Sequence, residues 1–107
     1  MAQRRDAGTT HLFRILISES AHLIWRIRNE RVIQGKPEAS PQEVHFRWLK
    51  AINNRLKIDC VLTNGVKYGK KAIDKSLVLR TWKKTLKNEE ILPKDWTRET
   101  GVLVGVG

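Results

Sequence analysis

Apolar residues recur at helical spacing along residues 12–33, which form the longest periodic segment of the chain. At about 100° per residue, the apolar positions gather on one broad arc and the charged and polar positions fall mainly on the opposite side. The arc consists of Leu12, Phe13, Leu16, Ile17, Leu23, Ile24 and Ile27. An arc of this width predicts a long amphipathic helix that contacts more than one neighbouring element.

Local signals set the expected ends of this helix. Thr9 or Thr10 is predicted to cap its start, because a threonine hydroxyl can accept a hydrogen bond from a free backbone N–H group. Gly35 tolerates positive φ at the other end, and Pro37 prevents continuation. A helix of about 24 residues is roughly 36 Å long, so the rest of the chain is expected to pack along it.

The segment SPQE at residues 40–43 predicts the start of a second helix. Ser40 is placed to cap the free N–H groups, Pro41 suits the first helical position, and Glu43 completes a capping box. The apolar stripe that follows consists of Val44, Trp48, Leu49, Ile52 and Leu56. A short connector between two long helices favours an antiparallel helical hairpin.

The second helix is expected to end near Leu62 or Thr63, with Gly65 in a left-handed conformation just beyond it. Residues 65–75 contain two glycines and four lysines, and this composition predicts a basic loop. Asp74 or Ser76 is predicted to cap a third helix, which runs roughly over residues 77–87. Its apolar positions recur at four-residue spacing and are Val78, Trp82 and Leu86.

The remaining residues are less regular. Pro93 interrupts any helix, and a turn is expected to tuck Trp96 back against the body. The end GVLVGVG is a short strand, a packed extended tail or the start of a segment that continues in a longer parent protein. The predicted fold is all-α: a small bundle of about three helices with an irregular C-terminal segment. We expect a single domain over residues 1–107, with 1–8 and 101–107 as flexible or extended ends.

The composition is that of a folded chain. Its 107 residues suffice for one domain, with 40% hydrophobic and 30% charged residues. The sequence contains no apolar run of about 18 residues, so neither a membrane span nor a membrane partner is expected. Cys60 is the single cysteine, which excludes an internal disulfide and suits a reducing compartment. We expect an intracellular protein, with the nucleus as one option.

Catalytic and metal-binding chemistry find little support in the sequence. The candidate metal ligands His11, His22, His45 and Cys60 show neither a Cys-x-x-Cys nor a His-x-x-x-His spacing. The 11 acidic residues are scattered and do not suggest the carboxylate cluster of a metal-dependent nuclease. A glycine-rich phosphate loop is also missing. The sequence therefore predicts a protein that is not an enzyme and has no cofactor or metal.

Positive charge is the strongest global feature, because 21 Lys and Arg against 11 Asp and Glu give a formal net charge of +10. A field of this sign favours polyanions, and nucleic acid before an anionic membrane surface. Lysines and arginines on the first and third predicted helices and on the basic loop can neutralise phosphates. The predicted phosphate contacts are Arg28, Arg31, Lys70, Lys71, Lys83, Lys84 and Lys87.

Aromatic residues divide between two expected roles. Tyr68, among the lysines of residues 65–75, either stacks on a base or anchors its loop. The four tryptophans are expected in the core rather than on a stacking platform, since Trp48 and Trp82 lie on apolar stripes.

Several stretches of the chain, taken in order, resemble a known family. Within LIWRIRNERVI at residues 23–33, the pattern Trp-x-x-Arg-Asn-x-Arg precedes an apolar residue. This pattern resembles the helix after the zinc-binding region in reverse transcriptases of non-LTR retrotransposons. The wider run resembles uncharacterised fungal proteins related to such elements and covers about residues 12–105. Its markers are ISESAHLIWRIRNERVI, SPQEVHFRWLKAIN, RLKIDCVLTN, KYGKKAI, VLRTWKKTL and LPKDWTRETGVLVG.

The chain departs from that family in its chemistry. It lacks the aspartate pair of a polymerase palm, the Cys/His ligands of the zinc segment and the acidic cluster of an RNase H site. The resemblance therefore implies a non-catalytic tail or remnant of a retroelement polyprotein. We expect a basic, nucleic-acid-associated module that contacts DNA or RNA mainly through the backbone. The alternative is a protein-interaction or scaffold module that packs on another domain of a longer polyprotein or on a second copy.

Overall fold

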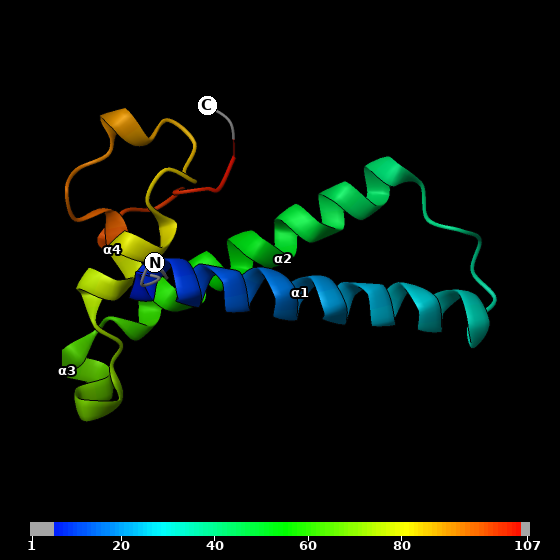
Figure 1. The fold of residues 1–107 in the computed structure, drawn as a ribbon, viewed down its shortest axis with the longest axis horizontal. Helices are drawn as coiled ribbons and strands as arrows, with labels where there is room; N and C mark the ends of the chain where they lie inside the picture. Colours follow the sequence, from blue (N-terminus) through cyan, green and yellow to red (C-terminus); the bar gives the residue numbers. More distant parts are fainter. Residues whose placement is uncertain (1–5, 106–107) are drawn as a thin grey trace, which may run out of the picture.

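The computed structural model describes residues 6–105, and these form an all-α fold, as the sequence predicts (Figure 1). Two long helices, α1 (Ala7–Val32) and α2 (Pro41–Leu62), form an antiparallel hairpin. Shorter elements follow along the chain: α3 (Gly65–Tyr68), η1 (Gly69–Lys71), α4 (Lys75–Trp82), η2 (Glu89–Ile91) and η3 (Trp96–Arg98).

The hydrophobic core lies at one end of the hairpin. There α4 and the C-terminal segment pack against the start of α1 and the end of α2 (Figure 1). The core residues are Ile15, Ile52, Leu56, Val78, Trp82, Leu86 and Trp96. We call this end the base. The other end, residues 19–50, is a two-helix arm in which Leu23 is the one buried apolar residue.

A buried carboxylate ties the three main helices of the base together. Asp59 of α2 is only 2% exposed, and its Oδ2 accepts a hydrogen bond from Trp82 Nε1 of α4 at 3.0 Å. The same oxygen lies 3.1 Å from His11 Nε2 of α1. A buried charge without partners is strongly unfavourable, so these contacts make the packing of the three helices specific.

The start of α1 differs from the prediction. The helix begins at Ala7 with Asp6 as its N-cap residue, so Thr9 and Thr10 lie inside it and the predicted threonine cap is wrong. The buried Gly8 faces the backbone of α4, which approaches so closely that a Cβ at this position would lie 2.8 Å from the Arg80 carbonyl carbon. This contact extends α1 beyond the expected boundary. Residues 7 and 8 therefore belong to the helix, while residues 1–5 lie outside the described part.

The buried face of α1 is narrower than the predicted arc. Ile15, which the arc omits, is buried, whereas Phe13, Ile17 and Ile24 are 50%, 56% and 67% exposed. The predicted contact with more than one neighbour is confirmed, because both α2 and α4 pack on α1. These two helices cover a stripe of α1 that is narrower than the apolar arc.

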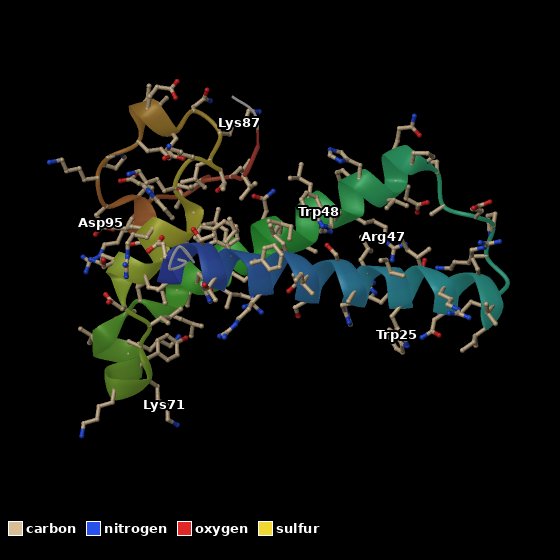
Figure 2. All side chains as sticks on the ribbon, viewed as in Figure 1. Trp25, Arg47, Trp48, Lys71, Lys87 and Asp95 are labelled. Atoms are coloured by element: carbon tan, nitrogen blue, oxygen red, sulfur yellow. The ribbon has the colours of Figure 1, made fainter. Side chains whose placement is uncertain are left out.

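The arm is fastened by polar contacts instead of a thick core. Trp48 Nε1 donates a hydrogen bond to Ser20 Oγ at 2.9 Å. The Arg47 guanidinium forms a two-pronged ion pair with Glu30, with N···O distances of 3.0 and 2.6 Å. Its hydrogen bonds lower the pKa of Glu30. Figure 2 shows Arg47 and Trp48 between α1 and α2. Together these contacts set the register of the hairpin.

The signals at both ends of the hairpin connector are confirmed. Gly35 has a φ of +66° just beyond α1. The Ser40 hydroxyl accepts a hydrogen bond from the Glu43 backbone N–H, and Pro41 opens α2. These features depend on neighbouring residues alone, which explains why the sequence predicts them well.

The segment after α2 is more ordered than a loop. Gly65 does not adopt the left-handed conformation expected past the helix end, because it begins α3. The Asn64 side chain caps this turn by accepting hydrogen bonds from the backbone N–H groups of Val66 and Lys67. Gly69 takes the positive φ instead. The lysines of residues 65–71 consequently lie on two short helical turns.

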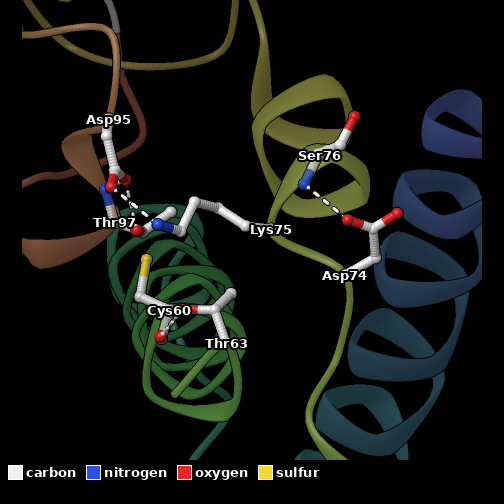
Figure 3. Close-up of polar contacts among 7 residues, drawn as sticks. All are labelled: Cys60, Thr63, Asp74, Lys75, Ser76, Asp95 and Thr97. Carbon is white, nitrogen blue, oxygen red and sulfur yellow. Dashed lines mark hydrogen bonds and ion pairs between the residues drawn. The ribbon is translucent and has the colours of Figure 1, made fainter. Parts of the chain in front are cut away.

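The third helix, α4, begins at Lys75, two residues before the expected start, and Asp74 is the one of the two predicted caps that it uses. The Asp74 carboxylate accepts a hydrogen bond from the Ser76 backbone N–H at 3.0 Å (Figure 3). However, α4 ends at Trp82 rather than Lys87. The Glu89 carboxylate accepts hydrogen bonds from the backbone N–H groups of Lys84 and Leu86 in the turn that follows.

Pairing with the C-terminal segment explains this early end. The Lys87 N–H donates to the Leu103 carbonyl at 2.7 Å, and the Gly105 N–H donates to the Thr85 carbonyl at 3.0 Å. Leu86 therefore forms a single antiparallel bridge with Val104, and residues 102–105 form a packed extended tail. Residues 106 and 107 lie outside the described part.

Trp96 is buried against the base, as predicted. The neighbouring Asp95 forms an ion pair with Lys75 Nζ at 2.9 Å, and its carboxylate accepts a hydrogen bond from the Thr97 backbone N–H (Figure 3). The hydrogen bond from the Thr97 hydroxyl and the ion pair with Lys75 lower the pKa of Asp95 to about 2. This polar cluster holds the C-terminal segment on α4.

Candidate nucleic-acid interface

A cleft of about 320 Å³ lies between α1 and α2, and four of its ten lining residues are Arg or Lys. We call it the basic cleft. Its polar lining is formed by Glu19, His22, Arg26, Arg47, Lys50, Asn54 and Arg55. Leu23, Ala51 and Ile58 complete the lining.

Helical periodicity brings the polar side chains of the cleft onto one face of each helix. His22 and Arg26 are four residues apart on α1, so they lie one above the other on the same face. Lys50 and Asn54 have the same spacing on α2, and Arg55 follows. Because the two helices are antiparallel neighbours, these faces meet across the cleft.

The cations of the cleft differ in how far they are neutralised. Arg47 is fully engaged with Glu30. The side chains of Arg26 and Lys50 form no hydrogen bond and no ion pair within 4.0 Å to another described residue, and Arg26 interacts with the Glu30 carboxylate only at longer range. Both side chains are exposed and remain available to an anion.

Arg55 is the least satisfied of these groups. Its Nη1 lies 3.8 Å from Glu19 Oε1, which is too long for a strong hydrogen bond. Its Nε is buried and has no hydrogen-bond partner within the described residues. Glu19 therefore compensates this charge only weakly, and an anionic group in the cleft would add an acceptor.

Trp25 lies beside the cleft and is 60% exposed, so the expectation that all four tryptophans are core residues is wrong for this one. Figure 2 shows its ring projecting from α1 on the side away from α2. The Trp25 ring stacks on the His22 ring with a centroid distance of 6.1 Å and an interplanar angle of 25°. A shallow hollow of about 370 Å³ adjoins the pair and is lined by Trp25, Arg26, Asn29, Glu30, Gln34 and Lys36.

All seven residues predicted to contact phosphate are exposed, but they do not form one surface. Arg28 and Arg31 lie at the arm end of α1. Gly8 touches α4, and the 20 residues from Gly8 to Arg28 span about 30 Å of helix. These two arginines are therefore far from the lysines of the base.

The lysines of the base form two further groups. Lys70 and Lys71 lie on η1, while Lys84 and Lys87 follow α4 and are not on it, contrary to the prediction. Lys83 is the C-cap residue of α4. Figure 2 shows Lys71 and Lys87 projecting from well-separated parts of the base. Their role as phosphate contacts stays a prediction.

Tyr68 lies near the lysines of η1 and is partly buried. The Lys67 ammonium sits over its ring, 5.5 Å from the centroid. This cation–π contact covers one ring face and favours the anchoring role over base stacking.

An apolar groove of about 550 Å³ also lies between α1 and α2, and it shares only Leu23 with the basic cleft. It is lined by Ser20, Leu23, Ile24, Ala39, Pro41, Val44, His45 and Trp48. On α1, Ile24 lies roughly 160° around the helix axis from the cleft residue Arg26. The arm is therefore two-sided, with a basic cleft and an apolar groove on different sides of the hairpin.

The sequence places Arg26 with Arg28 and Arg31 among the cations of the first helix, and Lys50 on the polar side of the second helix. Neither Arg26 nor Lys50 was among the seven predicted phosphate contacts, and nothing in the sequence placed the two together. The signal was the four-residue spacing of His22 and Arg26 and of Lys50 and Asn54. Their convergence additionally requires the register of the two helices, which is a tertiary property.

Among residues 6–105, no group of three or more His, Cys, Asp or Glu side chains is arranged to hold a metal ion. No helix in this part is long and apolar enough to span a membrane. Burial raises the pKa of the Cys60 thiol to about 11, which keeps it protonated and weakly nucleophilic at neutral pH.

Comparisons of this chain with protein families, with curated proteins and with solved structures found no match.

Proposed function

We propose that this protein is a non-catalytic module that binds nucleic acid through phosphate contacts, with the basic cleft of the arm as the principal site. The observation that carries the proposal is the convergence of Arg26 and Lys50, both without an ion-pair partner among the described residues, from two facing helices. The net charge of +10 would draw a polyanion toward any such site.

The geometry suits a phosphate chain better than a small anion. The cations of the cleft come from different turns of two helices, with Arg26 on α1 and Lys50 and Arg55 on α2. Lys50 and Arg55 are five residues apart, or about 7.5 Å along the helix axis, so the cleft can contact more than one phosphate of a strand. The peripheral candidates, such as Arg28 and Lys70, would then add long-range attraction rather than direct recognition.

The ordered motifs that resemble retrotransposon reverse transcriptases support the same proposal. In this interpretation the chain is a tail or remnant of a retroelement polyprotein, and nucleic acid is the natural partner of such a polyprotein. The proposal includes that the protein has no enzymatic activity.

The test is a salt titration with a matched control. Lys50→Gln and Lys94→Gln remove the same charge, but Lys94 is an exposed residue of the base and does not line the cleft. We expect the slope of log affinity against log salt to become shallower by about 0.7 to 0.9 for Lys50→Gln only. Equal effects of the two substitutions would reduce the cleft to an ordinary charged surface, and no binding at low salt would refute the proposal.

A second candidate function rests on the apolar groove. Ile24 at its edge and Phe13 and Ile17 along the same strip of α1 are exposed. A surface that carries both a groove and projecting apolar side chains can complement itself across a twofold axis. The candidate is therefore self-association, with a second copy of this chain in the groove.

Light scattering at several protein concentrations tests this candidate. We expect a dimer that Ile24→Asp converts to a monomer, because the new carboxylate would be buried in the interface. A wild-type monomer at every concentration would rule the candidate out.

A further inference from the structure

Among the four tryptophans, all of which lie within residues 6–105, Trp25 alone is mainly exposed. Trp82 and Trp96 are buried in the core, and Trp48 is partly buried and bonded to Ser20. A tryptophan side chain usually contributes its large apolar surface to a core or an interface. Trp25 does not pack into the core of residues 6–105, so most of its ring surface is available for a contact outside the chain.

The Trp25 ring is held in a defined orientation. His22 lies one helical turn earlier, and the two rings stack nearly parallel at 6.1 Å. His22 also lines the basic cleft, so the ring pair sits at its edge. Trp25 is 60% exposed, so its ring still has free surface on which a third aromatic ring can stack.

The surroundings of Trp25 suit a nucleobase better than an apolar side chain. The adjoining hollow is lined by charged and amide groups, among them Arg26, Asn29 and Lys36. Amide side chains can donate to and accept from the edges of unpaired bases. Arg26 lines both the hollow and the basic cleft, so a phosphate and its neighbouring base would lie on either side of one guanidinium.

We propose that Trp25, oriented by His22, is a base-stacking platform and that the polymer bound by the arm is single-stranded nucleic acid. This inference rests on the proposed phosphate binding in the basic cleft. Bases in a duplex already stack on one another, so a ring on a helix surface meets the backbone or the base edges of a duplex and not the base faces. Stacking on Trp25 therefore requires unpaired bases.

The test uses three labelled probes of equal length: oligothymidylate of about 12 nucleotides, an abasic strand with the same phosphates, and a duplex. We expect the wild-type protein to bind oligothymidylate most tightly. Trp25→Ala should weaken this binding roughly 5- to 150-fold, the range for one lost base stack. The same substitution should leave the affinity for the abasic strand unchanged.

Two further variants control the experiment. Trp25→Phe keeps an aromatic ring and should retain part of the affinity. Ile91→Ala removes exposed apolar surface on η2, far from the arm, and should change nothing. Thermal unfolding of each variant verifies folding. Quenching of tryptophan emission by oligothymidylate, but not by the abasic strand, gives a readout on the wild-type protein itself.

The outcomes separate the two proposals. If Trp25→Ala binds oligothymidylate as tightly as wild type while Lys50→Gln binds it more weakly, the stacking platform is wrong and phosphate binding stands. Preferential binding to the duplex would overturn the single-strand assignment. If none of the three probes binds at low salt, both proposals fail.

Discussion

Replacing Gly8 by alanine tests how closely α1 and α4 approach each other. A Cβ at this position would lie 2.8 Å from the Arg80 carbonyl carbon and 2.9 Å from the Thr81 backbone nitrogen. These are backbone atoms, so no side-chain rotation can relieve the contact. One of the helices would have to move, although α4 carries the fully buried Val78 and Trp82.

Two opposing effects decide the sign of the change. Alanine is a better helix former than glycine by about 1 kcal/mol, which would stabilise the protein. An extra methyl group in a tightly packed contact costs roughly 1 to 3 kcal/mol. The neighbouring atoms are backbone, so we place the cost at the upper end of that range. The expected net loss for Gly8→Ala is about 2 kcal/mol, or roughly 10 °C in Tm for a domain of this size.

Urea unfolding followed by tryptophan fluorescence measures this loss. The midpoint should fall while the m-value stays constant, because the same surface is exposed on unfolding. Gly65→Ala is the matched control, since a Cβ at Gly65 meets nothing within 4 Å and its φ is not positive. That variant should gain about 0.4 to 1 kcal/mol. If Gly8→Ala were as stable as wild type while Gly65→Ala behaved as expected, the close approach of α1 and α4 would be wrong.

Three other predictions concern the polar and titratable groups of the base. Asp59→Ala leaves the buried Trp82 N–H without an acceptor and should cost about 2 to 3 kcal/mol in urea unfolding, whereas a loss near zero would contradict the buried network. Cys60, with a pKa of about 11 against 9.0 for a free thiol, should react with iodoacetamide at pH 8 roughly 100-fold more slowly in the folded than in the unfolded protein. Because folding lowers the pKa of Asp95 from 3.8 to about 2, its stabilising effect is complete above pH 4 or so and is lost as the pH falls toward 2. Acid titration of stability should therefore show a smaller loss for Asp95→Asn than for wild type, and identical pH profiles would count against the Thr97 and Lys75 contacts.

The sequence alone predicted those structural features that depend on contacts between residues close together in the chain. Ser40 caps α2 through the N–H group three residues later, Asp74 caps α4 through the one two residues later, and Gly35 turns the chain beyond α1. Each feature involves neighbours in the chain, so the residue types at those positions are enough to predict it. The two long helices and the all-α class follow from these signals together with the apolar periodicity.

The sequence did not predict the structure correctly where contacts between distant segments override the local helical preference. The pattern Val78, Trp82, Leu86 reads as one continuous helix, yet the chain leaves the helix after Trp82. Residues 85–87 instead pair with the C-terminal tail, some 18 residues later. Local periodicity contains no information about that pairing, because it depends on where the tail folds back.

The candidate interface shows the same division. The sequence determined that the chain is strongly basic and that His22, Arg26, Lys50 and Arg55 lie on long helices. Only the tertiary structure decided that these side chains share one cleft and that Trp25 remains in solvent. The physical reason is that a broad amphipathic arc can meet α2 at several rotations. The hydrogen bond from Trp48 to Ser20 and the ion pair of Arg47 with Glu30 select one of them.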